Sequence, residues 1–247
     1  MQDRYAGDIG DYIKFALLRF LSPGRRLGVA WYLYPDENHN SDGKHIAYLR
    51  NPILWRHLDE VLFDQLHEML RLGRSVSALE RSGVLNADYH RTSVACFAHQ
   101  AATRDQFRTS WFKDLQATLF SCDLIFADPD NGLVDDDPAR RRLNKFGKHM
   151  ALGEARKLAE GRTVVVYHHN SRFAGGHDRE VDHWLEQLGH SAFAVRASKI
   201  SCRTFFIVNP TGDIKDRAIE FCKRWTAYGV RYHEPNLANV GVGSAFR

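Results

Sequence analysis

Acidic and imidazole side chains directly follow two of the most apolar segments of this sequence. Asp128 comes after the apolar run 124–127, and His168 comes after the run 163–167. A carboxylate can accept hydrogen bonds from an amino group or bind a cation, and an imidazole can serve as a general acid or base. The carboxyl ends of neighbouring parallel strands meet at one edge of a sheet, where ligands bind. If both runs are such strands, the two side chains predict an active site beyond that edge.

The segment 128–131 has the sequence Asp-Pro-Asp-Asn. Enzymes that methylate the exocyclic amino group of a nucleobase have Asp, Asn or Ser followed by Pro-Pro and an aromatic residue at this place. The first side chain and a backbone carbonyl accept hydrogen bonds from the amino group, and the aromatic ring stacks on the base. Asp128 and Pro129 match the first half of this pattern, whereas Asp130 and Asn131 replace the second half. We predict that all four are catalytic, although the same residues also suit a plain turn.

A second group of polar residues lies near the start of the sequence, where the apolar spacing predicts a helix over 9–21. Asp8 precedes this helix and is suited to cap it. Asp11 and Lys14 then fall in its first turns. Acidic and basic side chains at the start of a helix would form a polar rim over a cofactor pocket.

Alternating strand and helix patterns indicate how these residues are positioned. The segments expected to be strands are 27–34, 74–80, 123–127, 163–167, 191–197 and 204–209. Besides 9–21, helices are expected over 54–72, 103–120, a stretch ending near residue 160, 177–189 and 213–227. The connection between the last two strands is too short for a parallel crossover, so these strands are expected to be antiparallel. The order predicts an α/β fold, a three-layer Rossmann-like sandwich with a mostly parallel sheet and a C-terminal antiparallel strand pair.

No repeat or linker divides the sequence, so residues 1–247 are expected to form a single domain with a small helical insertion over 50–75. Lys and Arg number 34 against 30 Asp and Glu, and the net charge of +4 permits a nucleic-acid partner. No apolar run reaches the ~20 residues of a membrane-spanning helix, and the first residues lack the pattern of a signal peptide. We therefore expect a cytoplasmic protein with no membrane partner.

Together, the first helix and the Asp-Pro turn resemble the 23S ribosomal RNA adenine-N6 methyltransferase family. Ala6, Gly7, Asp11 and Lys14 fall in register with that family's opening motif, His-Ala-Gly-Asn-X-Ala-Asp-Val-X-Lys-His. Asp128 falls on the first residue of its Asp-Pro-Pro-Tyr motif. The resemblance implies a Rossmann-like enzyme that transfers a methyl group from S-adenosylmethionine to a nucleic acid or a nucleotide.

The resemblance also implies where the methyl donor lies. S-adenosylmethionine is expected near Asp128 and in contact with a set of charged residues, namely Asp11, Lys14, Asp36, Glu37 and Glu80. Tyr167, which ends a predicted strand, and His168, which follows it, are expected to join the catalytic residues. The residues expected to bind the substrate are His169, Arg172, Arg141 and Lys145. The cationic members of this last set suit contacts with phosphate groups.

Two other interpretations fit the same residues. Asp36, Asp42, Asp128 and Asp130 would repel one another at one sheet edge unless a cation such as Mg²⁺ bound them. His168 and His169 would then supply ligands or a general base of a metal-dependent nuclease or phosphohydrolase. Alternatively, a methyltransferase-like sheet that has lost its pocket would be a catalytically inactive binding protein.

Overall fold

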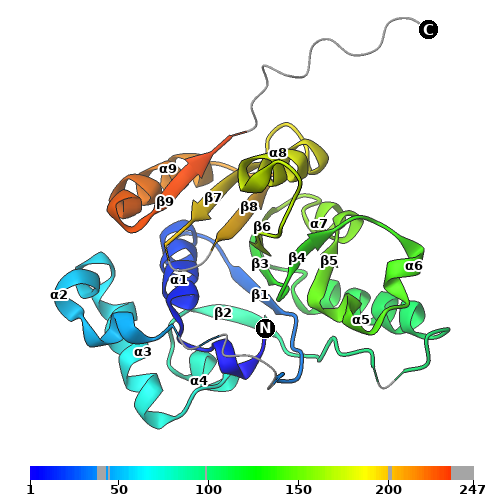
Figure 1. Ribbon diagram of the computed structural model, residues 1–247, viewed down its shortest axis with the longest axis horizontal. Coiled ribbons are helices and arrows are strands. Elements are labelled where there is room, and N and C mark those ends of the chain that lie inside the picture. Colours follow the sequence, from blue (N-terminus) through cyan, green and yellow to red (C-terminus); the bar gives the residue numbers. More distant parts are fainter. Residues whose placement is uncertain (38–42, 44, 98, 200–201, 235–247) are drawn as a thin grey trace, which may run out of the picture.

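A seven-stranded sheet forms the centre of the computed structural model, which describes residues 1–37, 43, 45–97, 99–199 and 202–234 (Figure 1). Its strand order is β2-β1-β3-β6-β8-β7-β9. The strands are β1 (Leu27–Trp31), β2 (Ala87–His90), β3 (Leu124–Asp128), β6 (Thr163–His169), β7 (Phe193–Ala197), β8 (Arg203–Val208) and β9 (Val230–His233). The first four strands of this order are parallel, β8 is antiparallel to β6 and β7, and β9 is antiparallel to β7. The predicted Rossmann-like fold class is confirmed.

Helices cover both faces of this sheet and make three layers (Figure 1). The helices are α1 (Ile9–Leu21), α2 (Pro52–Trp55), α3 (Glu60–Leu72), α4 (Val76–Arg81), α5 (Arg104–Thr118), α6 (Pro138–Arg141), α7 (Leu152–Leu158), α8 (Gly176–Leu188) and α9 (Ile214–Trp225). Side chains alternate along the strands, so Val29 packs in the core under α1 and α9, whereas Ala30 packs in the core under α5, α7 and α8. Within the described ranges, no helix has both the length and the apolar character needed to cross a membrane.

Helix α1 has the bounds that the sequence predicts. The Asp8 side chain caps it by accepting a hydrogen bond from the Asp11 N–H at 3.1 Å. A short connection joins α1 to β1, so the helix runs back along the strand that follows it. The first turns of α1, with Asp11 and Lys14, therefore lie beside the carboxyl end of β1 (Figure 1).

One predicted strand, 74–80, is wrong. This segment forms α4, whose first turn is capped when the Ser75 hydroxyl accepts a hydrogen bond from the Ala78 N–H at 3.0 Å. The second strand of the chain is instead β2, and Glu80 lies on the helix before it. A short run with few apolar residues fits the helical and the extended period equally well, and here the serine cap and the packing of Val76 and Leu79 favour the helix.

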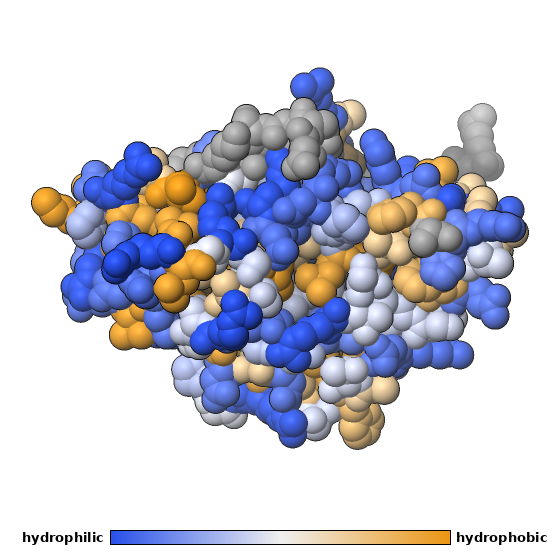
Figure 2. All heavy atoms as spheres, turned by 90° about the horizontal axis from the view of Figure 1, so that it is seen from below, coloured by the Kyte–Doolittle hydropathy of each residue, from blue (hydrophilic) through white to orange (hydrophobic). Residues whose placement is uncertain are grey.

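The helices between β1 and β2 pack on α1 and share its core. The Tyr12 ring of α1 stacks on Tyr48 with 5.2 Å between ring centroids and meets the edge of Phe63 at 6.0 Å. Some apolar side chains of α2 and α3 remain exposed, including Ile53 and Val61. Figure 2 shows a largely hydrophilic face with apolar atoms gathered toward the side where these helices lie in Figure 1.

A small parallel pair, β4 (Gly132–Val134) and β5 (His149–Ala151), follows the end of β3. Gly132 has a φ of +93°, and a Cβ atom there would lie 2.3 Å from Nδ1 of His168 and 2.6 Å from its Cα. The chain can therefore turn from β3 into β4 only because this residue has no side chain.

We expect Gly132→Ala to lower the free energy of unfolding by about 2–4 kcal/mol, because both a left-handed backbone and a steric clash oppose the new methyl group. Urea unfolding measures the change. Gly161→Ala is the matched control, since Gly161 has a φ of +73° but no atom within 4 Å of the position that a methyl group would occupy. Equal losses in the two variants would contradict the clash.

Candidate functional site

A cavity of about 210 Å³ lies at the carboxyl ends of β3 and β6, beside the first turns of α1. Many of the residues predicted to do chemistry line it: Asp11, Lys14, Asp128, Asp130, Asn131, Tyr167 and His169. Its wall also includes residues that the sequence did not predict there: Met1, Tyr5, Asp8, Gly10, Gly43, His45 and Arg203. The described part of the chain thus brings the helix start, the Asp-Pro turn and the end of β6 together around one hollow.

A buried ion pair network forms the floor of this cavity. The Lys14 ammonium lies 2.8 Å from Oδ1 of Asp11 and 2.9 Å from Oδ2 of Asp128. The exposed fractions of Lys14, Asp11 and Asp128 are 4%, 2% and 3%. The N–H of Gly7 also donates a hydrogen bond to Oδ2 of Asp11 at 2.8 Å, and the centre of the Tyr167 ring lies 5.7 Å from the ammonium. Helix α1 and strand β3 are therefore joined by charged groups that are shielded from water.

Burial and charge pairing shift the pKa values of this network in opposite directions. Burial raises the pKa of Asp11 and of Asp128, and the nearby Lys14 ammonium only partly opposes the rise. For Lys14, burial favours the neutral amine, but the two carboxylates outweigh it and raise the pKa of the ammonium. The Lys14 side chain therefore stays charged, and its single positive charge is shared by the carboxylates of Asp11 and Asp128.

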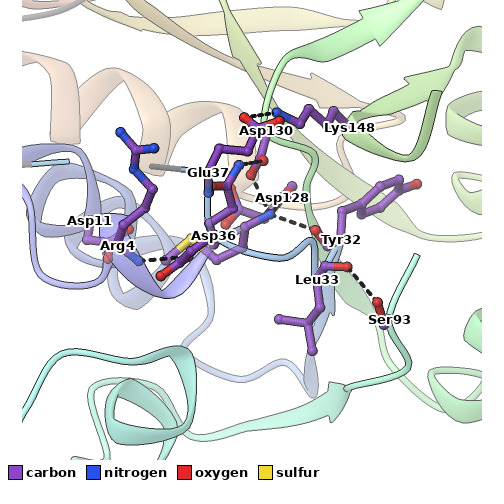
Figure 3. A network of polar contacts seen from close by, with 12 residues as sticks. Arg4, Asp11, Tyr32, Leu33, Asp36, Glu37, Ser93, Asp128, Asp130 and Lys148 are labelled. Carbon is purple, nitrogen blue, oxygen red and sulfur yellow. Dashed lines mark hydrogen bonds and ion pairs between the residues drawn. The ribbon is translucent and has the colours of Figure 1, made fainter. Parts of the chain in front are cut away.

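The residues that follow Asp128, namely Asp130 and Asn131, are held in place by contacts with the first two residues and with Lys148. Oδ1 of Asp130 lies 2.7 Å from the Met1 nitrogen, and Oδ2 accepts a hydrogen bond from Gln2 Nε2 at 2.7 Å. The N–H of Asn131 donates a hydrogen bond to the Lys148 carbonyl at 2.9 Å. The carboxylates of Asp128 and Asp130 thus have defined positions on the cavity wall (Figure 3).

The acids of the loop after β1 lie next to the cavity but outside its wall. Asp36 accepts a hydrogen bond from the Arg4 N–H at 3.2 Å, and Glu37 forms an ion pair with Lys148 (Figure 3). Asp36 and Glu80 both line a neighbouring hollow of about 470 Å³, which shares Met1 with the first. Asp36 and Glu80, which are expected to bind the donor, therefore line a different hollow from the cavity lined by Lys14 and Asp128.

Glu80 reaches the neighbouring hollow from α4 and not from the end of a strand. Its Oε1 accepts a hydrogen bond from Nε1 of Trp31 at 2.8 Å, and its Oε2 accepts one from Nε of Arg91 at 2.6 Å. The acid is thereby tied to the end of β1 through the indole of Trp31.

His168 does not line the cavity, contrary to its predicted catalytic position. It lies within β6, where alternation directs its ring to the opposite face from Tyr167 and His169, and it packs 5.9 Å from Trp184. Its Nδ1 accepts a hydrogen bond from the Leu133 N–H at 3.0 Å, and its Nε2 lies 3.2 Å from Glu180. Both ring nitrogens are occupied, so His168 anchors β4 and α8 to the sheet.

Three residues expected to bind the substrate also lie away from the cavity wall. Arg141 forms ion pairs with Asp105 and with Glu154, the latter at 3.5 Å. Lys145 and Arg172 are exposed on the surface. Of the predicted substrate-binding residues, the structure places only His169 at the cavity.

No metal centre is apparent in residues 1–37, 43, 45–97, 99–199 and 202–234, where no group of three His, Cys, Asp or Glu side chains is arranged to hold an ion. Of the carboxylates expected to bind Mg²⁺, Asp42 lies outside these ranges. Asp128 is paired with Lys14, and Asp130 contacts the Met1 nitrogen. Asp128 and Asp130 therefore have cationic partners from the protein itself, whereas Asp36 accepts a hydrogen bond from the Arg4 backbone N–H.

Arg203 is a cavity residue that sequence reasoning missed. It is the first residue of β8 and pairs in register with His169, the last residue of β6. Its Nη2 lies 3.6 Å from Oδ2 of Asp8. A strand that pairs antiparallel with β6 begins at the edge where β6 ends, but the sequence predicted only the pairing of 204–209 with 191–197, so it gave no sign of this position.

A buried acid stabilises the loop after β6 and predicts a pH dependence. Glu180 accepts hydrogen bonds from Asn170 at 3.1 Å and from the Ser171 hydroxyl at 2.6 Å, besides its contact with His168. Burial raises the pKa of Glu180, but these hydrogen bonds outweigh burial and lower the pKa to about 2. The stabilisation is therefore complete above the unfolded-state pKa of about 4.3 and is lost as the pH falls toward 2.

We expect Glu180→Gln to lower the free energy of unfolding at pH 7 by about 2–3 kcal/mol, the cost of weakening hydrogen bonds to a charged group. The difference from the unmodified protein should shrink progressively below pH 4. Urea unfolding at a series of pH values measures it. The exposed Glu186 on the same helix provides the control Glu186→Gln, and a pH-independent loss in Glu180→Gln would contradict the assignment.

We expect Lys14→Met to destabilise the protein by about 3–5 kcal/mol, because it leaves two buried carboxylates without their cation. Lys145→Met, at an exposed position, should change stability by less than about 0.5 kcal/mol. Chemical unfolding of both variants gives the comparison. A Lys14→Met variant as stable as its control would show that the network carries no free energy of folding.

Comparison of the sequence with models of known protein families gives no match, and comparison with curated protein sequences gives none either. The resemblance of the first helix and the Asp-Pro turn to the adenine-N6 methyltransferases stays a prediction. A function for this chain is therefore inferred from its fold and from the geometry of the cavity.

Proposed function

We propose that this chain is an S-adenosylmethionine-dependent methyltransferase that acts on a nucleotide or a nucleic acid. The observation that carries the proposal is the contact of Lys14 with Asp128, which are 114 residues apart in sequence and 2.9 Å apart in space. These residues belong to the two segments on which the resemblance to the adenine-N6 methyltransferases rests. Their side chains meet on the wall of one cavity, at the sheet edge where ligands of this fold class bind.

The residues of this region suit the chemistry of the donor. S-adenosylmethionine carries a positive sulfonium, and the cavity presents the carboxylates of Asp8, Asp11 and Asp128 together with the ring of Tyr167. Carboxylates and aromatic faces both attract a cation. The neighbouring hollow adds Asp36 and Glu80, acids of the kind that accept hydrogen bonds from ribose hydroxyls. Asp11, Lys14, Asp128 and Tyr167 would then border the reacting end of the donor.

When bound, the donor supplies an electrophilic methyl group. Asp128 then has the task of orienting the acceptor, because its carboxylate can accept a hydrogen bond from an amino or hydroxyl group. Lys14 holds the Asp128 side chain in place through their ion pair. Burial raises the pKa of Tyr167, so its phenol stays protonated and can donate a hydrogen bond. In such a site the rate enhancement comes mainly from proximity and orientation.

The methyl acceptor is a nucleotide or a nucleic acid, a broader class than the single methyl donor. The net charge of +4 and the exposed Lys145 and Arg172 suit a substrate with phosphate groups. Asp130 and Asn131 take the places of the proline and the aromatic ring that would stack on a base. Stacking must therefore come from another ring, and Tyr5 and Tyr167 are the aromatic residues on the described cavity wall.

We expect S-adenosylmethionine and S-adenosylhomocysteine to stabilise the protein, by about 2.7 kcal/mol at a hundred times the dissociation constant. Thermal unfolding with and without each nucleoside measures this. Tritium transfer from labelled S-adenosylmethionine to RNA, DNA and nucleotides then identifies the acceptor. Asp128→Ala should reduce transfer by about a hundredfold or more, since alanine cannot accept a hydrogen bond from the acceptor and orient it.

Asp123→Ala is the matched control, because Asp123 lies just before the other end of β3, where it accepts a hydrogen bond from the Arg26 N–H at 2.9 Å. Full transfer activity in Asp128→Ala would remove Asp128 from the mechanism. Failure of both nucleosides to bind the unmodified protein would overturn the proposed function.

A further inference from the structure

Arg203 carries a buried positive charge that the described residues only partly satisfy. The residue is 6% exposed, and its Nη1 atom is buried without a hydrogen-bond partner in the described ranges. The Nη2 atom lies 3.6 Å from Asp8, which is an ion pair but not a hydrogen bond. Buried guanidinium groups are normally hydrogen-bonded, so an unmatched donor on a cavity wall indicates a missing acceptor.

The guanidinium also lies against the first turn of α1. A Cβ atom on Gly10 would lie 2.5 Å from Nε and 2.7 Å from Cζ of Arg203, so the absence of a side chain at this position gives the arginine its place. Helix α1 has 13 residues, and its N-terminus carries the positive end of the helix dipole. A fixed cation and a helix start therefore face the same cavity.

The described acids of the cavity leave the Nη1 donor of Arg203 without an acceptor. Asp11 and Asp128 are paired with Lys14, and Asp130 lies 2.7 Å from the Met1 nitrogen. Among the described carboxylates of the wall, Asp8 is the one paired with Arg203, and its Oδ1 already accepts a hydrogen bond from the Asp11 N–H at 3.1 Å. The planar fork of a guanidinium matches the paired oxygens of a carboxylate or a phosphate.

We propose that Arg203, held against the first turn of α1 at Gly10, binds a carboxylate or phosphate group of the ligand that enters this cavity. The anion accepts the hydrogen bond that Nη1 lacks. This inference names a ligand group in the cavity of the proposed function and relies on that function only for the choice of nucleoside probes. Two sources supply such a group, the amino-acid carboxylate of the methyl donor and a phosphate of the acceptor.

Isothermal titration of the full chain with matched probes distinguishes these sources. S-adenosylhomocysteine against 5′-methylthioadenosine reports on the carboxylate, and adenosine 5′-monophosphate against adenosine reports on the phosphate. Inorganic phosphate alone reports on the anion site without any nucleoside. In Arg203→Gln, at least one anionic probe should lose about tenfold or more in affinity, the value of a hydrogen bond to a charged group, while its neutral counterpart is unaffected.

Arg196→Gln is the control for this variant. Arg196 lies on β7, is 8% exposed, and forms an ion pair with Asp178 away from the cavity. The Arg196→Gln variant should be less stable than the unmodified protein but should bind the anionic probes with unchanged affinity. If Arg203→Gln binds every anionic probe as tightly as the unmodified protein, the inference is wrong. If phosphate binding depends on Arg203 but no nucleoside binds at all, the anion site stands and the methyltransferase proposal fails.

Gly10→Ala tests the same site without removing a charge. Gly10 is in a helix, where alanine is favoured over glycine, so the variant should fold, as far-UV circular dichroism can verify. The added methyl group must displace the guanidinium, and the anionic probes should again lose about tenfold in affinity. A folded Gly10→Ala variant with unchanged affinities would equally overturn the proposal.

Discussion

The contact of one buried ammonium with two buried carboxylates holds the site together. Lys14 lies between Asp11, its neighbour on α1, and Asp128, at the end of β3. Removing charged groups from water is costly, and the cost is recovered only while each charge keeps its partners. The network therefore sets the distance between helix and strand and with it the floor of the cavity. The same burial raises the pKa of both carboxyls, and the Lys14 ammonium only partly opposes the rise.

The topology explains why so many polar groups meet at this edge. Parallel strands β1, β3 and β6 all end there, α1 begins there because it runs back along β1, and β8 begins there because it is antiparallel to β6. Helix α1 adds an ammonium and a carboxylate, the end of β3 and the turn after it add carboxylates, β6 adds an aromatic hydroxyl and an imidazole, and β8 adds a guanidinium. Among these groups, Arg203 has a buried donor, Nη1, without a hydrogen-bond partner in the described residues. This unmatched donor supports the inference that an anionic group of a ligand binds there.

Alternation along a single strand decides which imidazole is chemically available. The apolar run ends at Tyr167, so His168 and His169 were expected to follow the strand together, but β6 continues through both and their side chains lie on opposite faces of the sheet. His169 reaches the cavity, whereas His168 is buried with Glu180 and the backbone of β4. Gly132 packs directly against His168, because only a residue without a side chain can pass so close to it. A strand that is two residues longer than predicted thus changes a catalytic candidate into an anchor.

Local signals were enough to predict the helix over 9–21, the apolar strands at the centre of the sheet and the class of the fold, because apolar periodicity, an aspartate cap and turn residues act over a few neighbouring positions. They also located Asp11, Lys14 and Asp128, which lie at the ends of those elements. They did not separate α4 from a strand, since a short amphipathic run fits both periods, and they gave no sign that Glu80 would approach from a helix. The place of Arg203 came from the folded chain, through its antiparallel register with His169 and its contact with Gly10. Such long-range pairing leaves no mark in the neighbouring residues of the sequence.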